Sequence, residues 1–200
     1  MKKIPLALIY LRLIIGFLIL TLSYFHVKHY TTIAIIFFSI GLLSDIFDGI
    51  IARRLNISTQ TLRRLDSIVD QAFWLLVALA TYIECPTFFY NNYIELSILI
   101  AFELLTYIVC FIKFRKEVAT HAISSKIWTL LLFSVIVQLI LSCDSGLLFQ
   151  VCFYIGVATR MEIIMIILLL KTWTNDVPSV YHAVLLRKGK PIKRNKIFNG

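Results

Sequence analysis

Long apolar segments alternate with short polar ones along most of the chain. Each apolar segment is close to the length of about 20 residues that an α-helix needs to cross the hydrocarbon core of a bilayer. Hydropathy that is high over such lengths is typical of membrane-spanning helices. The sequence therefore predicts an all-α, polytopic membrane protein with six transmembrane helices, at residues 4–25, 31–52, 67–84, 91–112, 127–147 and 151–171.

The composition excludes the other common classes of protein. Of the 200 residues, 60% are apolar and 16% are charged, whereas an ordinary globular domain is about 45–50% apolar. A globule of this size could not bury so much apolar surface. Disordered chains, collagen and coiled coils need polar, glycine-rich or heptad-charged sequences, so they are excluded as well.

Basic residues gather in every second gap between the apolar segments. The positive-inside rule places these gaps, and with them both termini, in the cytoplasm. We therefore expect an integral membrane protein, of a bacterial cell (inner) membrane, with a six-helix domain over residues 1–174, a cytoplasmic-side active site and a basic cytoplasmic tail over residues 175–200. The net charge of +9 then reflects topology and contact with anionic membrane lipids, so nucleic-acid binding is not expected. The basic positions are Lys2, Lys3, Arg53, Arg54, Arg63, Arg64, Lys113, Arg115, Lys116 and the tail from Arg187 to Lys196.

The first apolar segment looks at first like a signal peptide, because Lys2 and Lys3 precede it. Arg12 interrupts the apolar run, and no Ala-x-Ala-like cleavage site follows it. We therefore expect residues 4–25 to be retained as the first helix.

The four cysteines show no spacing typical of a metal site. Cys85 and Cys143 fall near the gaps that are expected to face outward, so they could form a disulfide in an oxidising compartment. Sequence alone does not establish the geometry that such a bond needs. Whether Cys85 and Cys143 pair stays open at this point.

Four of the six aspartates lie within 26 positions, at one end of the second apolar segment and the start of the third. Asp45, Asp48 and Ala52 are spaced i, i+3 and i+7, so they share one face of a helix. Asp66 and Asp70 are spaced i and i+4 and share a face of the next helix. Carboxylates at membrane depth normally face a protein interior or a polar cavity. Two antiparallel helices joined by a short loop would bring the two acid pairs together.

Four carboxylates that converge in a low-dielectric region repel one another unless cations neutralise them. Hard divalent ions prefer oxygen ligands, and Mg²⁺ or Mn²⁺ fits best where phosphate also binds. A two-metal carboxylate site stabilises both the attacking and the leaving oxygen of a phosphoryl-type displacement. Gly49 and Ala52 would leave room for a ligand beside the helix, and Arg53 could grip phosphate through two hydrogen bonds.

A structural role for these aspartates is the alternative. They could cap helices and pair with neighbouring arginines at an ordinary helix interface. That reading would be preferred for a single pair of aspartates, whereas four of them on two matching faces favour a functional site. The arginines concerned are Arg53, Arg54, Arg63 and Arg64.

The aspartate segment resembles the signature of the CDP-alcohol phosphotransferase family, D-x2-D-G-x2-A-R-x8-G-x3-D-x3-D. Every fixed position except one matches: Asp45, Asp48, Gly49, Ala52, Arg53, Asp66 and Asp70. Thr59, and Leu65 just before Asp66, also resemble the family's usual loop. Leu62 stands where the signature has its second glycine, which helps to leave space around the cytidine in the family. A leucine there could narrow the pocket, shift the nucleotide, or mark an altered or lost activity.

The resemblance implies that a CDP-linked lipid donor, usually CDP-diacylglycerol, gives its phosphatidyl group to a small alcohol and releases CMP. It implies that Asp70 is also the catalytic base that takes the proton of the acceptor hydroxyl. The metal ligands of a two-metal Mg²⁺ or Mn²⁺ site would be Asp45, Asp48, Asp66 and Asp70. The donor would be bound by Gly49, Ala52, Arg53 and Thr59. A homodimer is compatible with the sequence.

The acceptor side matches the family in fewer places. Glu103 resembles the acid of an Arg-Glu pair in glycerophosphate-using relatives, although Phe102 replaces the arginine. Lys126 resembles the first lysine of their G-K-x-K-T motif, with Trp128 in place of the second. Arg160 could bind an anionic acceptor or balance the aspartates. Glycerol 3-phosphate is the leading candidate for the acceptor. The alternative for Lys126 is that its side chain only extends to the membrane surface and binds no ligand.

Three rival functions remain. A transporter with an acidic ion path would also place carboxylates in a membrane, yet it would not need Gly49, Ala52 and Arg53 at these offsets. Intramembrane prenyltransferases also use paired aspartate motifs with Mg²⁺, but they are longer than this chain and have more helices. A binding relative that has lost catalysis is the most serious rival, because of Leu62.

Overall fold

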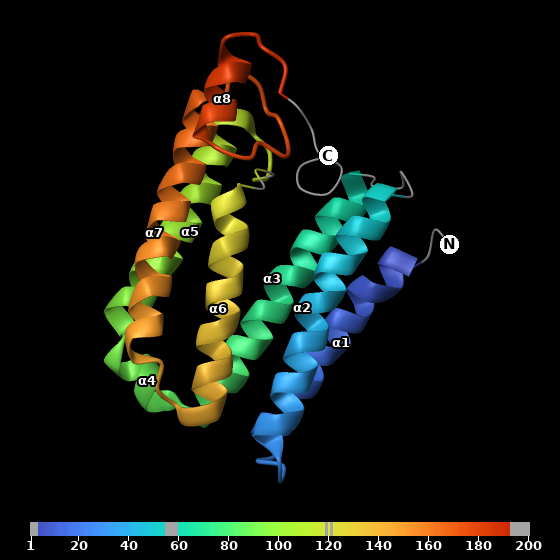
Figure 1. Cartoon of the computed structure of the whole chain (residues 1–200), viewed down its shortest axis with the longest axis vertical. Helices are drawn as coiled ribbons and strands as arrows, with labels where there is room; N and C mark the ends of the chain where they lie inside the picture. Colours follow the sequence, from blue (N-terminus) through green and yellow to red (C-terminus); the bar gives the residue numbers. More distant parts are fainter. Residues whose placement is uncertain (1–3, 55–59, 119, 121, 193–200) are drawn as a thin grey trace. The chain divides into compact units, whose positions relative to one another are not determined.

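The structure is a computed structural model that describes residues 4–54, 60–118, 120 and 122–192. The described residues form helices and connecting segments, without a strand (Figure 1). In chain order, the helices are α1 (Ile4–Tyr24), α2 (Tyr30–Arg54), α3 (Gln60–Glu84), α4 (Pro86–Asn91), α5 (Tyr93–Phe114), α6 (Ile123–Ser142), α7 (Gly146–Leu169) and α8 (Val180–Arg187).

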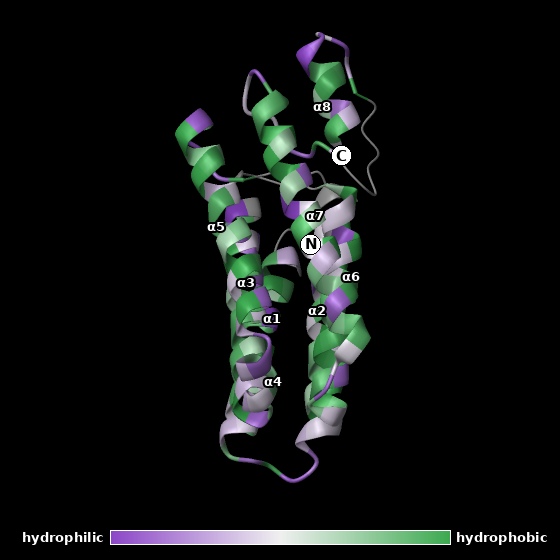
Figure 2. Cartoon of the chain, turned by 90° about the vertical axis from the view of Figure 1, so that its left-hand side faces the viewer, coloured by the Kyte–Doolittle hydropathy of each residue, from purple (hydrophilic) through white to green (hydrophobic). Residues whose placement is uncertain are grey.

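Six of these helices are long and apolar enough to cross a membrane, which confirms the predicted fold class. Apolar residues predominate along them (Figure 2). The candidate spans are Pro5–Tyr24, Tyr30–Ile51, Arg64–Glu84, Tyr93–Phe114, Ile123–Ser142 and Gly146–Leu169. The short helices α4 and α8 were not expected, because neither is long enough to produce an apolar segment of spanning length.

The predicted helix ends differ from the observed ones most at the start of α3 and at the turn between α6 and α7. Helix α3 begins at Gln60, seven residues before the predicted apolar segment. The first turns of this helix are polar, so hydropathy alone does not detect them. Helix α6 ends at Ser142 rather than near residue 147. The next residue, Cys143, has a positive φ of 55°, and that left-handed conformation ends the helix.

The chain divides into two compact units. Unit 1 comprises Met1–Phe89 and Ile136–Asp144, and unit 2 comprises Tyr90–Val135 and Ser145–Gly200. The expected division into a membrane domain over residues 1–174 and a tail over residues 175–200 stays a prediction.

In unit 1, helix α1 packs against both α2 and α3. Helices α2 and α3 meet through aromatic side chains, with the ring centroids of Phe38 and Phe73 5.9 Å apart. A Cβ atom at Gly41 of α2 would lie 2.3 Å from Cζ of Phe73, so only glycine permits this approach. A disulfide between Cys85 and Cys143, with Cα atoms 5.2 Å apart, closes the far end of the unit. The pairing that the sequence left open is therefore present in the structure.

In unit 2, helix α7 packs against α5 and α8. Lys113, near the end of α5, donates hydrogen bonds to the carbonyl oxygens of Ile167 (3.0 Å) and Leu168 (2.7 Å) at the end of α7. These bonds satisfy carbonyl groups that have no partner within their own helix. A Cβ atom at Gly156 of α7 would lie 2.5 Å from Nε1 of Trp128, so this glycine lets the tryptophan of α6 lie against α7.

Candidate metal centre

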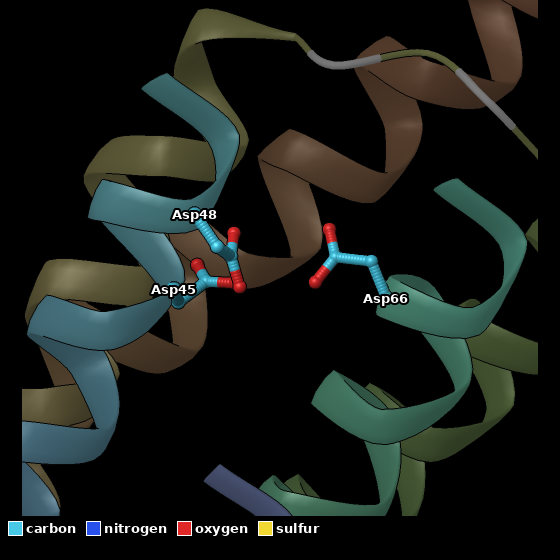
Figure 3. Close-up of side chains that lie close together, drawn as sticks. All are labelled: Asp45, Asp48 and Asp66. Carbon is cyan, nitrogen blue, oxygen red and sulfur yellow. The ribbon is translucent and has the colours of Figure 1, made fainter. Parts of the chain in front are cut away.

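Helices α2 and α3 present their aspartates to the same region of unit 1. Asp45 and Asp48 come from α2 and face Asp66 on α3 (Figure 3). One carboxylate oxygen from each of these three residues lies within 4.8 Å of the other two. Asp48 is almost fully buried, with 3% of its side chain exposed, whereas Asp45 and Asp66 are partly exposed. The predicted convergence of the two acid pairs is present in the structure.

A buried arginine from α1 lies at the centre of this cluster. The Arg12 side chain has no exposed surface. Its Nη1 atom lies 2.6 Å from the Asp45 carboxylate and 3.5 Å from that of Asp70. Its Nη2 atom contacts the carboxylate of Asp48 and lies 3.2 Å from that of Asp66. Each terminal nitrogen therefore lies between one aspartate of α2 and one of α3.

The sequence did not predict Arg12 as a site residue, although it contained the signal. An arginine inside an apolar segment is unfavourable unless it is paired or faces a cavity. That argument holds for Arg12 as well as for Arg160, because both arginines interrupt apolar segments. The expectation that α2 and α3 alone would form the cluster is also incomplete, because α1 packs against both and supplies the central cation.

The charges in the cluster do not balance. Four carboxylates carry four negative charges when ionised, and the Arg12 guanidinium supplies one positive charge. Repulsion between like charges is strong where water is scarce, so the cluster favours additional cations. Its ligand atoms are all oxygens, the type that hard divalent ions prefer.

The spacing of the oxygens fits a metal ion. Ligand oxygens lie about 2.0–2.1 Å from a Mg²⁺ ion, so two oxygens on opposite sides of it are about 4 Å apart. The oxygens of Asp45, Asp48 and Asp66 lie within 4.8 Å of one another, so small side-chain rotations would bring them to one ion. The cluster Asp45, Asp48 and Asp66 could therefore hold a metal.

The predicted donor-binding residues are only partly described. Gly49 is half-buried and follows Asp48 directly in α2. Ala52 and Arg53 belong to the last turn of α2, but their side chains lie outside the described part of the chain. The whole of Thr59 lies outside it as well. Leu62 is half-buried in the first turn of α3, so the position of the missing glycine lies on a helix rather than in a loop.

The structure brings two of the three predicted acceptor residues together within unit 2. Arg160 of α7 forms an ion pair with Glu103 of α5. Its guanidinium also stacks 4.9 Å above the ring of Trp128, whose Nε1 atom donates a hydrogen bond to the carbonyl oxygen of Cys152 (3.2 Å). Lys126, near the start of α6, is exposed.

Comparison with known proteins identifies one family. The model of the CDP-alcohol phosphatidyltransferase family matches residues 2–174, a stretch that includes both α2 and α3. No curated protein and no solved structure matches the chain.

Proposed function

Because the chain belongs to the CDP-alcohol phosphatidyltransferase family, we propose that it transfers a phosphatidyl group from CDP-diacylglycerol to a small anionic alcohol and releases CMP. Family membership itself implies a membrane-spanning transferase of phospholipid synthesis that uses a CDP-linked donor and an alcohol acceptor. The carboxylate cluster of α2 and α3 is the observation that carries the proposal, because such a cluster suits a reaction at a diphosphate.

In this proposal, Asp45, Asp48, Asp66 and Asp70 hold two divalent ions, either Mg²⁺ or Mn²⁺. The family generally uses divalent metals. When bound, the ions would neutralise the diphosphate and stabilise the charge that develops on its oxygens. The four carboxylates would hold the ions in place, and the burial of Asp48 limits the access of water at that point.

Asp70 is the proposed base for the acceptor hydroxyl. It is the most exposed of the four carboxylates, at 39% of its side chain, and lies furthest from Arg12, at 3.5 Å. Both features support a role for Asp70 as the carboxylate that can meet an incoming hydroxyl group. The hydroxyl oxygen would attack the phosphorus that bears the lipid while Asp70 takes its proton, and the bond from that phosphorus to CMP would break.

We assign donor binding to Gly49, Ala52, Arg53 and Thr59, at the end of α2 and in the segment that follows. A glycine beside Asp48 leaves room for a nucleotide to approach the helix, and an arginine can bind phosphate with two parallel hydrogen bonds. The family signature supports this assignment at Gly49, Ala52 and Arg53, and Thr59 resembles the family's usual loop.

The proposed acceptor is glycerol 3-phosphate, with Lys126, Arg160 and Glu103 as its binding residues. Lys126 and Arg160 supply positive charge for the acceptor phosphate. Arg160 already shares its charge with Glu103, so the acceptor phosphate would join or replace that carboxylate.

We also propose that both termini and the loop between α2 and α3 face the cytoplasm. The distribution of basic residues supports this orientation. The disulfide supports it independently, because Cys85 directly follows the end of α3, about 28 Å along the helix axis from Asp66. Disulfides persist in oxidising compartments, so that end of unit 1 belongs outside the cytoplasm. Cysteine-accessibility labelling that placed positions near Asn92 and Asn195 on the same side of the membrane would contradict the orientation.

The decisive experiment is an assay of CMP release by the full-length protein in detergent. We expect release from CDP-diacylglycerol with glycerol 3-phosphate in the presence of Mg²⁺ or Mn²⁺, and none after addition of a chelator. Inositol phosphate, serine and ethanolamine derivatives serve as alternative acceptors, and a prenyl diphosphate serves as the control donor. Absence of CMP release with every acceptor would reject CDP-diacylglycerol as the donor.

A further inference from the structure

Arg12 occupies the region that a cation shared by the aspartates would occupy. Its two terminal nitrogens each lie between one carboxylate of α2 and one of α3: Nη1 between Asp45 and Asp70, and Nη2 between Asp48 and Asp66. In two-metal sites the ions likewise lie close together, about 3.5–4 Å apart, among a common set of ligands. The guanidinium therefore contacts the same four carboxylates that would hold the divalent ions.

We propose that Arg12 is a displaceable counter-ion, which holds the four aspartates together when no divalent ion is bound and gives up these contacts when ions bind. The proposal rests on the metal site of the proposed function and deepens it. It makes Arg12 a positioning residue for the metal ligands and a competitor of the metal.

Electrostatics requires the competition. A guanidinium and a divalent ion at the same carboxylates would be in near contact, and their positive charges repel strongly in a buried region. The buried guanidinium cannot lose its proton to relieve that repulsion. Binding of an ion between Asp48 and Asp66 must therefore weaken or break the contacts of Nη2.

The hydrogen bonding of Arg12 is incomplete in this position. The Nε atom is buried and has no hydrogen-bond partner among the described residues. Buried polar groups in finished structures are nearly always paired, and an unpaired one calls for an explanation.

The experiment measures Mn²⁺ binding to the full-length protein in detergent by electron paramagnetic resonance, without substrates. Arg12→Gln removes the competitor, so we expect it to bind the first Mn²⁺ at least tenfold more tightly than the wild type, which corresponds to about 1.4 kcal/mol. Arg160→Gln is the matched control, because it removes the same charge from an ion pair in unit 2. We expect it to leave Mn²⁺ affinity unchanged.

Arg12→Lys separates displacement from a general effect of charge. Lysine keeps the positive charge but has a single nitrogen, which cannot lie between both pairs of carboxylates. Displacement therefore predicts that Arg12→Lys also binds Mn²⁺ more tightly, by about threefold, whereas a purely long-range charge effect predicts no change. Unchanged or weaker affinity in Arg12→Lys would overturn the proposal, and so would unchanged affinity in Arg12→Gln.

Thermal unfolding gives a second readout. In a chelator, Arg12→Gln should unfold at a lower temperature than the wild type, because the four carboxylates have lost their counter-ion. Saturating Mn²⁺ should remove most of this difference. If Arg12→Gln unfolds during purification without metal, Arg12→Lys decides the question alone. A wild-type protein that binds no Mn²⁺ would instead reject the metal site of the proposed function.

Discussion

Arg12 and Arg160 both lie inside candidate membrane spans, and their surroundings differ in charge. Arg12 is fully buried and contacts four aspartates from two other helices. Arg160, with 15% of its side chain exposed, pairs with Glu103 and stacks on Trp128. With every acid ionised, the first group carries a net charge of −3 and the second carries none.

The comparison separates a cluster of net negative charge, which favours further cations, from an ion pair whose two charges cancel. A neutral ion pair needs no further cation, because the charges of its two partners cancel. A cluster with excess negative charge remains unfavourable until further cations bind. The charge balance, rather than the presence of a buried charge alone, therefore distinguishes the aspartate cluster of unit 1 from the Arg160 pair of unit 2.

Replacing one aspartate of the cluster should have the largest effect on activity. We expect Asp45→Asn, Asp48→Asn, Asp66→Asn and Asp70→Asn each to lower CMP release on the order of a thousandfold or more, because each removes a ligand from a coupled set. Each variant also relieves repulsion, so its thermal stability in a chelator should match or exceed that of the wild type.

Asp144→Asn is the control for these variants, because Asp144 is an exposed aspartate beyond the end of α6. It should retain full activity. Wild-type activity in any two of the four cluster variants would reduce the cluster to a structural feature and remove the contrast with Arg160.

Breaking the pair in unit 2 should affect stability without affecting metal dependence. We expect Glu103→Gln and Arg160→Gln each to lower the free energy of unfolding by about 1–2 kcal/mol, since each leaves a partly buried charge without its partner. The double variant should cost less than the sum of the two, with a coupling energy of about 1 kcal/mol. Denaturant titration in detergent measures all three values. Strictly additive costs would show that the pair contributes nothing, and an altered Mn²⁺ requirement would link it to the cluster.

Substitutions of Leu62 test whether an uncharged side chain of unit 1 affects binding of the donor. We expect Leu62→Gly to change the KM for CDP-diacylglycerol by less than about tenfold, or 1.4 kcal/mol. Leu62 lies in the first turn of α3, so glycine there should also lower helix stability by about 1 kcal/mol. Leu62→Ala shortens the side chain without that penalty and is the matched variant. A large gain of activity in both variants would show that the leucine obstructs the nucleotide pocket.

The sequence by itself determined the six spans and the faces on which the aspartates lie. Hydropathy over about 20 residues reports a helix that crosses a bilayer, and spacings of three and four residues place side chains on one helix face. Both signals are local, so one chain is enough to read them. The family signature is local as well, since it lies within residues 45–70.

The tertiary structure alone decided which distant groups meet. Arg12 reaches the aspartates because α1 packs against both α2 and α3 with that face turned inward, and the sequence of α1 does not specify its partners. The Cys85–Cys143 bond and the Arg160–Glu103 pair likewise join residues more than fifty positions apart. Periodicity shows which side of a helix carries a residue, but the packing of helices determines what that side faces, and charge balance depends on that packing.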